Sequence, residues 1–277
     1  MLIHAHVLAW NEARIAPLFL DHYHWVDRIY VHDNLSTDGS VAVWSADERV
    51  TVLPYDTQGQ IRDDEYVRIK NTAWKLHSAA ADWVLVVDAD EFLWMPKPRQ
   101  LLQRLRSAPD ANAYAMVLPV GWEVIADGIP EFPASASTPE QRLAHWARRG
   151  MRSDWYSKPC LFQPSFLAET NYRPGAHVAK PVFRNGQGWV AEERDAQGRE
   201  LRTGQPGDDR DFELLHMKMA MGAEHQEQRR RAYATRLSAI NKVNGWGAEY
   251  QDEDFVAQQR ELTRLHSVEL TFLGRPR

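Results

Sequence analysis

The feature that most constrains the fold is an apolar run that ends abruptly in acidic residues. Residues 83–87 read Trp-Val-Leu-Val-Val without any polar alternation, and Asp88-Ala89-Asp90-Glu91 follow at once. A short unbroken run rich in β-branched residues predicts a strand that is buried on both faces, as in the middle of a parallel sheet. The chain must therefore cover both faces of that sheet, and helices are the usual cover.

The acids that end this run predict either a cation site or a turn. Asp88 and Asp90 are two residues apart, so in extended backbone their side chains point to the same side. Two carboxylates about 5 Å apart repel by roughly 3 kcal/mol at an effective dielectric constant of about 20. A divalent cation would relieve that repulsion, and oxygen-only ligands favour Mg²⁺ or Mn²⁺ over zinc. The alternative is an acid pair that caps a turn after a core strand, and the pair alone does not decide between the two.

Strands and helices alternate four times in the first part of the chain. Such alternation predicts an α/β unit with parallel strands and right-handed crossovers. The expected strands are 2–10, 26–32, 50–54 and 83–87, and the expected helices are 15–23, 41–44 and 61–81.

Polar side chains follow each of these four strands. Ligands of open α/β sheets bind at the carboxyl ends of the strands, so these side chains are candidates for one shared site. Turn and helix-capping roles compete with ligand binding at most of these positions. The candidates are Asn11, Glu12, Asp33, Asp56, Asp88 and Asp90.

The rest of the chain is less regular. Helices are expected over 99–105, 139–149, 223–243 and 255–265, and strands over 113–120, 157–164, 177–183 and 212–219. Residues 121–138 are expected to form a mobile loop before the helix at 139–149, and residues 186–207 a β-hairpin or a flexible excursion.

Composition excludes several classes of protein. The chain has 33 basic and 38 acidic residues, a net charge of −5, which indicates no bias toward nucleic acid or a membrane surface. Cys160 is the single cysteine, which excludes an intramolecular disulfide, fits a reducing cytoplasm and predicts a buried, inert thiol. No basic segment followed by a long apolar core opens the sequence, so no signal peptide is expected. No apolar run is long enough to span a bilayer.

Three motifs in the first third of the chain resemble one branch of the family 2 glycosyltransferases. They are Asn11-Glu12, the Asp-Asn-Leu-Ser-Thr-Asp-Gly-Ser segment at 33–40, and Asp-Ala-Asp-Glu-Phe at 88–92. Three motifs in order are more specific than any one alone. Looser matches follow at Lys158-Pro159, at residues 175–177 and at residues 215–218.

The resemblance implies a GT-A type fold with a mostly parallel, Rossmann-like sheet. Residues 1–110 would bind the nucleotide sugar, 111–220 would bind the acceptor on a continuous sheet, and 221–277 would be helical. It also implies transfer from a UDP- or GDP-sugar to a glycan or lipid-linked acceptor, with Mn²⁺ or Mg²⁺, as in envelope polysaccharide synthesis. A cytoplasmic enzyme working at the inner face of the membrane, as a peripheral protein, would suit that role.

The resemblance also suggests roles for individual residues. Asp90 is the expected direct metal ligand, with His216 beside it, and Asp88 reaches the metal through water or the ribose. The expected nucleotide-sugar contacts are Asn11, Glu12, Asp33, Asp56, Asp88 and Lys218. Asp127 and Asp154 are alternative general bases if the enzyme inverts configuration. His177 is a weaker site candidate. From composition alone, the side chains of residues 229–231 are expected to form a solvated helix face, with contact to anionic lipid or a charged acceptor as the alternative.

Two other kinds of function remain open at this point. One is a nucleotidyltransferase or phosphohydrolase on a related sheet, which would require a glycine-rich phosphate loop after the first strand, whereas residues 10–14 contain no glycine. The other is a non-catalytic protein that binds nucleotide sugars or glycans.

Overall fold

The first sheet carries the strands that were predicted from the alternation. The computed structural model describes residues 1–108, 115–184 and 212–274. The sheet has the order β3-β2-β1-β4-β9-β6, and its first four strands are parallel, whereas β9 and β6 are antiparallel additions. Its strands are β1 (Ile3–Ala9), β2 (Arg28–Asp33), β3 (Val50–Pro54), β4 (Trp83–Asp88), β9 (Leu161–Phe162) and β6 (Met116–Val117).

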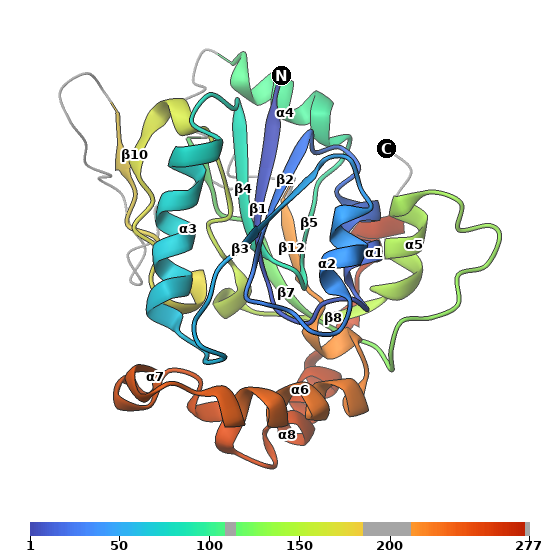
Figure 1. The fold of residues 1–277 in the computed structure, drawn as a ribbon. Coiled ribbons are helices and arrows are strands. Elements are labelled where there is room, and N and C mark those ends of the chain that lie inside the picture. The colour runs from blue at the N-terminus through green and yellow to red at the C-terminus, as the bar shows by residue number, and fades with distance from the viewer. Residues whose placement is uncertain (109–114, 185–211, 275–277) are drawn as a thin grey trace.

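Helices cover both faces of this sheet, which confirms the α/β class. Figure 1 shows α3 on one face and α1 and α2 on the other. Their bounds are α1 Ala16–His22, α2 Ser40–Ser45 and α3 Asp63–His77. The run at 83–87 is buried at every position, as a central strand between two helical layers requires.

A second sheet begins directly after the acidic turn. It has the order β13-β8-β7-β12-β5, from β13 (Val268–Glu269), β8 (Arg149–Arg152), β7 (Val120–Ile125), β12 (Glu213–His216) and β5 (Glu91–Trp94). The sequence did not predict β5, because residues 88–92 read as an acidic loop. In the register of β5 and β12, Glu91 lies opposite His216, so the turn joins the two sheets beside that histidine.

The middle of the chain departs most from its prediction. Instead of one strand over 113–120, the described residues form β6 and then β7, which occupies part of the expected loop. The helix expected from 139 is confirmed as α5, whereas only β9 forms within 157–164 and the prediction for 186–207 lies outside the described residues. The other elements here are α4 (Pro98–Arg106), α5 (Pro139–Trp146), β10 (Leu167–Glu169), β11 (Val182–Phe183) and the short 3₁₀ turns η2 (Asp154–Tyr156), η3 (Pro164–Phe166) and η4 (Pro174–Ala176).

The C-terminal segment is helical, as predicted, but its first helix is broken. Leu237 has extended backbone, with ψ of 119°, and Ser238 caps a new helix by accepting a hydrogen bond from the Asn241 amide. Figure 1 shows α6, α7 and α8 as a layer at the end of the sheet where β1 and β4 finish. The elements are η5 (Lys218–Ala220), α6 (Ala223–Arg236), α7 (Ala239–Asn244), η6 (Ala248–Gln251), α8 (Phe255–His266) and η7 (Thr271–Gly274).

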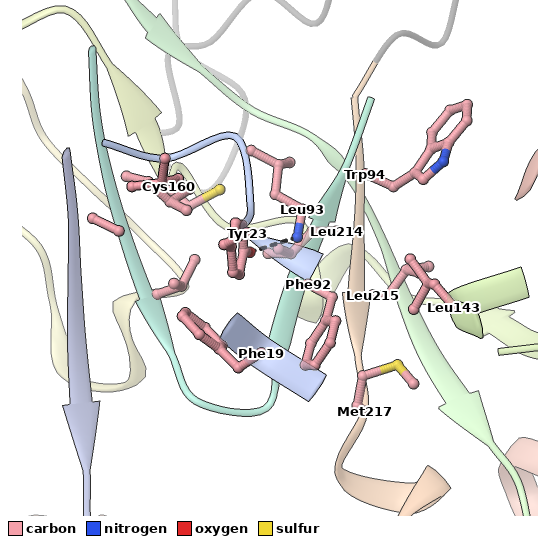
Figure 2. Close-up of a cluster of buried hydrophobic side chains, with 14 of the residues drawn as sticks. Phe19, Tyr23, Phe92, Leu93, Trp94, Leu143, Cys160, Leu214, Leu215 and Met217 are labelled. Carbon is pink, nitrogen blue, oxygen red and sulfur yellow. Dashed lines mark hydrogen bonds between the residues drawn. The ribbon is translucent and has the colours of Figure 1, made fainter. Parts of the chain in front are cut away.

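The core between α1 and the second sheet fixes where the acidic turn lies. Figure 2 shows Phe19 of α1 and Tyr23, the residue that follows this helix, facing Phe92 of β5. The Tyr23 hydroxyl donates to the Glu91 carbonyl at 2.9 Å and accepts from the Leu93 amide at 2.7 Å. Burying aromatic rings of this size contributes roughly 1.5–3 kcal/mol each. The start of β5, and with it the acidic turn, is therefore anchored by a buried tyrosine.

Cys160 belongs to the same core, as Figure 2 shows. It is buried, and burial raises the pKa of its thiol well above the ordinary range, which keeps the sulfur protonated. The sequence prediction of a buried thiol is confirmed. Across the described part of the chain, no helix has both the length and the apolar character that crossing a bilayer requires.

Candidate active site

The predicted edge of the sheet opens into a cleft of about 640 Å³. It lies at the carboxyl ends of β1 and β4, and the C-terminal helical layer forms its opposite wall. Its lining combines acids, cations and aromatic rings from widely separated parts of the chain. They include Trp10, Glu12, Tyr55, Asp63, Tyr66, Lys70, Asp88, Asp90, Trp155, Tyr156, Lys158, His177, His216, Lys218, Arg229, Tyr233 and Tyr250.

Two lysines neutralise the first acid of the turn. The Asp88 carboxylate lies 2.8 Å from the Lys70 ammonium of α3 and 3.7 Å from the Lys158 ammonium. Lys158 also pairs with Glu91, whose carboxylate accepts from the Asp88 amide at 2.9 Å. Burial alone would raise the pKa of Asp88, but the two lysines lower it. The mutual repulsion expected of these acids is therefore relieved largely by lysines.

Asp90 faces the cleft without a lysine of its own. Its backbone carbonyl accepts from the Met217 amide at 2.7 Å, and its carboxylate lies 3.9 Å from Nε2 of His216. Burial works to raise the pKa of Asp90, but His216, Arg229, Lys218 and Lys158 together lower it to about 2. Asp90 is thus an ionised carboxylate among several cations, where additional anions would also be attracted.

His216 is held in a fixed orientation by a buried acid. Its Nδ1 lies 3.1 Å from the carboxylate of Glu123, which is completely buried on β7, and the Tyr156 ring stacks on the imidazole at 4.1 Å between centroids. Burial lowers the pKa of His216, whereas Glu123 and Asp90 raise it, and the net direction is upward. The Nδ1–carboxylate bond leaves Nε2 turned toward Asp90, an arrangement typical of histidines that bind metal ions.

A metal ion would find two protein ligands here. Among the described residues, no group of three or more His, Cys, Asp or Glu side chains is arranged to hold a metal. Asp90 and His216 nevertheless offer an oxygen and a nitrogen that face each other, whereas the Asp88 oxygens lie against lysines. Mg²⁺ sites often use one or two carboxylates and take their other ligands from substrate phosphates and water. The donor set fits that kind of site.

The C-terminal layer contributes two cations to the cleft. Arg229 of α6 pairs with Glu12 at 2.7 Å, and the Lys218 ammonium lies 5.0 Å from the centre of the Tyr250 ring. Burial raises the pKa of Glu12 above its ordinary value, against the opposing effect of Arg229. The placement of Lys218 and Glu12 in the cleft agrees with the predicted set.

The solvated helix face predicted for 229–231 is wrong for two of its three residues. Arg229 lies under the loop that follows β1, and Arg230 is buried and pairs with Glu227 at 2.8 Å. Only Arg231 is exposed. The prediction failed because the helix lies across the end of the sheet, where it covers the Glu12 carboxylate.

Two other predicted contacts are engaged in the turns themselves. The Asp33 carboxylate accepts from the Ser36 amide at 2.9 Å and from its hydroxyl at 2.5 Å, and the Asn11 side-chain carbonyl accepts from the Thr37 amide at 2.8 Å. Neither Asn11 nor Asp33 is among the residues that line the cleft. The structure places both in the wall behind it.

The 33–40 segment ties the β1–α1 turn to the start of α2. Side chains of Ser36, Ser40 and Asp38 accept hydrogen bonds from three consecutive backbone amides, at residues 11–13, over 2.6 to 3.0 Å. Partial burial would raise the pKa of Asp38, but hydrogen bonds from Ser40 and from the Ala13 amide lower it. These amides are therefore unavailable to a bound phosphate.

Three predicted acids lie away from the cleft. Asp56 is exposed and accepts from the Gln58 amide at 2.6 Å, while Asp127 has a side chain 93% exposed and pairs with Arg260 at 3.0 Å. Asp154 is exposed at the start of η2. None of the three lines the cleft, so neither candidate base is placed against it.

Several cleft residues were not singled out from the sequence. Lys70 and Tyr156 line the cleft, and Glu123 supports His216 from behind it; none gave a local signal, because each acts through a partner from a distant part of the chain. Lys158 stands in the Lys158-Pro159 match, which could have indicated it. The weaker candidate His177 does line the cleft.

Comparison with known proteins gives only distant likenesses. No family model matches the chain. A 4-diphosphocytidyl-2C-methyl-D-erythritol synthase structure matches with a TM-score of 0.34 and 20% identity, over 74% of this chain and 95% of that one. A mannosyl-3-phosphoglycerate synthase from Rubrobacter xylanophilus matches with a TM-score of 0.33 and 13% identity, over 60% of this chain and 54% of that one. Scores of this size do not define a family.

Proposed function

We propose that the chain is a glycosyltransferase that moves a sugar from a nucleoside diphosphate donor, a UDP- or GDP-sugar, to a glycan or lipid-linked acceptor. The observation that carries the proposal is one cleft at the carboxyl ends of β1 and β4, in which ionised Asp90 and oriented His216 lie among cations. The motif resemblance to family 2 glycosyltransferases supports the same activity. The cations are Lys70, Lys158, Lys218 and Arg229.

Sugar transfer places negative charge on the departing diphosphate, and the cleft is built to offset that charge. Asp90 and His216 are the proposed ligands of Mn²⁺ or Mg²⁺, which supplies Lewis-acid stabilisation of the diphosphate when bound. Lys218 and Arg229 lie on the wall formed by the C-terminal layer, where they can neutralise phosphate oxygens. Residues 221–277 would therefore take part in donor binding.

Asp88 is proposed to hold the donor ribose. Lys70 and Lys158 fix its carboxylate, yet its side chain keeps 33% of its surface exposed. An ionised carboxylate accepts several hydrogen bonds at once, so a ribose hydroxyl can donate to Asp88 while the lysines remain in place. We place the donor over the region 1–110 and the acceptor against the region 111–220.

The loop after β1 favours this proposal over phosphate-loop chemistry. A nucleotidyltransferase or phosphohydrolase of that type needs free backbone amides in a glycine-rich turn. Here the backbone amides of residues 11–13 already donate hydrogen bonds to the side chains of Ser36, Ser40 and Asp38. Side-chain cations and a divalent ion are left as the means of binding a diphosphate.

Titration calorimetry of UDP and GDP, with and without Mn²⁺, tests the proposal. We expect one nucleotide to bind more tightly with Mn²⁺ and the Asp90→Ala variant to lose that increment. Asp56→Ala is the matched control, because Asp56 is an exposed turn acid outside the cleft. If neither nucleotide binds the native chain in the presence or absence of metal, the proposal is wrong. Metal-dependent transfer retained by Asp90→Ala would remove Asp90 from the ligands.

A further inference from the structure

The rim of the cleft carries an exposed tryptophan. Trp155 of η2 is 64% exposed and lines the cleft, and among the described residues it is the one tryptophan in the exposed class. Single exposed apolar side chains are common, but an aromatic ring that lines a concave site beside polar groups is typical of ligand-binding pockets. The chain could have buried this ring, as it buries Trp44, Trp74 and Trp83.

The surrounding residues hold Trp155 in place. The His177 ring lies against the indole with 4.1 Å between centroids, and Nδ1 of His177 donates to the Trp155 carbonyl at 2.5 Å. Gly175 makes room for this contact, because a Cβ at that position would lie 2.4 Å from the His177 ring. Gly175 also has a φ of 73°, a backbone conformation that residues with a side chain rarely adopt. The ring is therefore positioned by a built support and does not simply project into solvent.

The support connects the rim to the acidic centre. Tyr156, the next residue of η2, turns inward and stacks on His216 at 4.1 Å with an angle of 15° between the rings. His216 in turn faces Asp90 at 3.9 Å. Two consecutive residues of η2 thus have different roles. The Tyr156 side chain contacts His216, a proposed metal ligand, and the Trp155 side chain forms the rim of the cleft.

We infer that the Trp155 indole, supported by His177, is the subsite that receives a sugar ring of the acceptor. Pyranose rings present a face of C–H groups that packs on an aromatic plane, while their hydroxyls need polar neighbours such as those of this cleft. The name acceptor subsite depends on the proposed glycosyltransferase function. Tyr55 and Tyr66, on the β1 side, leave the donor base a separate aromatic surface.

Saturation-transfer NMR on the full chain tests the inference without nucleotide or metal. The probes are methyl glycosides of glucose, galactose, mannose and N-acetylglucosamine. We expect the native chain to transfer saturation to the ring protons of at least one probe, and Trp155→Ala to reduce that signal at least fivefold. Trp155→Phe should keep most of the signal, and Trp155→Leu, which is apolar but not planar, should lose it. No signal with the native chain, or equal signals with Trp155→Ala, would overturn the inference.

The same variants separate this inference from the proposed function. Calorimetry with UDP or GDP and Mn²⁺ should give equal affinities for the native chain and Trp155→Ala. If Trp155→Ala weakens nucleotide binding as much as glycoside binding, the indole belongs to the donor site. The inference is then wrong, while the proposed function stands. Glycoside binding without any nucleotide binding supports the subsite and contradicts the transferase. Leu76→Ala, which removes a side chain 79% exposed on α3, is the matched surface control.

Discussion

Lys158 is the residue on which the acidic centre depends most. It is 5% exposed, it pairs with Glu91, and it lies 3.7 Å from Asp88. Glu91 is itself only 2% exposed. Burial would lower the pKa of Lys158, but Glu91 and Asp88 raise it, so the ammonium stays charged. The Lys158 side chain therefore compensates the buried carboxylate of Glu91.

Replacement of that lysine should destabilise the whole protein. We expect Lys158→Met to lower the free energy of unfolding by about 3–5 kcal/mol, because Glu91 would keep a buried charge without a partner. Lys75→Met is the matched control, since Lys75 pairs with Glu169 at the surface, where such pairs contribute up to about 1 kcal/mol. Urea denaturation measures both variants. Equal losses would show that the burial of the Lys158–Glu91 pair has no energetic consequence.

Glu123 should control metal affinity through His216. Glu123→Gln keeps the shape of the side chain but weakens the hold on the imidazole Nδ1, which lies 3.1 Å from the carboxylate. Loss of such a partner typically costs 10–100-fold in metal affinity or activity, and we expect a Mn²⁺ affinity reduced by about that factor. Calorimetry with Mn²⁺ and UDP is the measurement.

The second sheet offers a matched control for that substitution. Glu213 is also buried and lies on β12, but its carboxylate accepts from the Trp122 indole at 2.6 Å, whereas that of Glu123 bonds to His216. Glu213→Gln should leave the Mn²⁺ affinity unchanged. If both variants bind Mn²⁺ like the native chain, His216 does not need Glu123 to hold its orientation.

The acids of the cleft were predictable from the sequence, and their partners were not. Asp88 and Asp90 follow an unbroken apolar run that predicts a buried strand, so their place at the sheet edge was predictable from the local sequence. Short polar side chains often accept hydrogen bonds from backbone amides of their own turn. The Asp33 carboxylate does so with the Ser36 amide, and it therefore does not extend into the cleft. Lys158 comes from a segment whose path depends on the assembled sheets.

At the level of elements, a small set of hydrogen bonds joins the C-terminal layer to the start of α3. The Ile61 amide donates to the Arg236 carbonyl at 2.7 Å, and the Asp63 amide donates to the Asn241 side chain at 3.1 Å. Asn241 is completely buried and also donates to the Asp63 carboxylate. The break at Leu237 is what brings Asn241 to the start of α3.

Removal of the Asn241 amide should loosen α7. We expect Asn241→Ala to lower the free energy of unfolding by about 1–3 kcal/mol, because the half-buried amide and carboxylate of Asp63 lose their partner. Amide hydrogen exchange in residues 239–244 should become faster, since local opening no longer breaks these bonds. Asn244→Ala, at the exposed end of the same helix, is the matched control. Unchanged exchange in Asn241→Ala would mean that α7 is held by other contacts.

The regular elements were predicted well and the short ones poorly. Strand 50–54 was predicted to the residue, and helix α5 begins at its expected position. These elements carry their own signals, namely apolar runs and a capping box at Thr138. β5 has four residues and pairs with β12, more than a hundred positions away, so nothing near it in the sequence shows that it is a strand.

For the molecule as a whole, three buried histidines contribute to the response to acid. His22 is buried against the second sheet and bonds to the Leu93 carbonyl, and His6 lies 3.1 Å from His32 on neighbouring strands. Burial lowers the pKa of His22 and of His32 to about 4, and it lowers the pKa of His6 well below the ordinary value of 6.5. The folded state therefore resists taking up protons that the unfolded chain accepts.

Stability should fall as the pH drops from about 6.5 toward 4. In that interval the unfolded chain binds more protons than the folded one, so each such histidine removes up to about 1.4 kcal/mol per pH unit, whereas above 6.5 its contribution is complete. His22→Gln keeps an N–H donor for Leu93 and cannot titrate, so it should reduce this slope by about one proton. Urea denaturation at a series of pH values measures the slope, and exposed His266→Gln is the control. An unchanged slope in His22→Gln would contradict the assignment.

The acidic turn between β4 and β5 has a consequence for how such proteins can diversify. Because β5 belongs to one sheet and β4 to the other, while β9 and β6 return to the first, a cut near residue 110 would leave both sheets incomplete. Neither half is a separable module. A relative that exchanges its second half must retain the pairing of β5 with β12, because that pairing holds the acidic turn at the edge of the cleft.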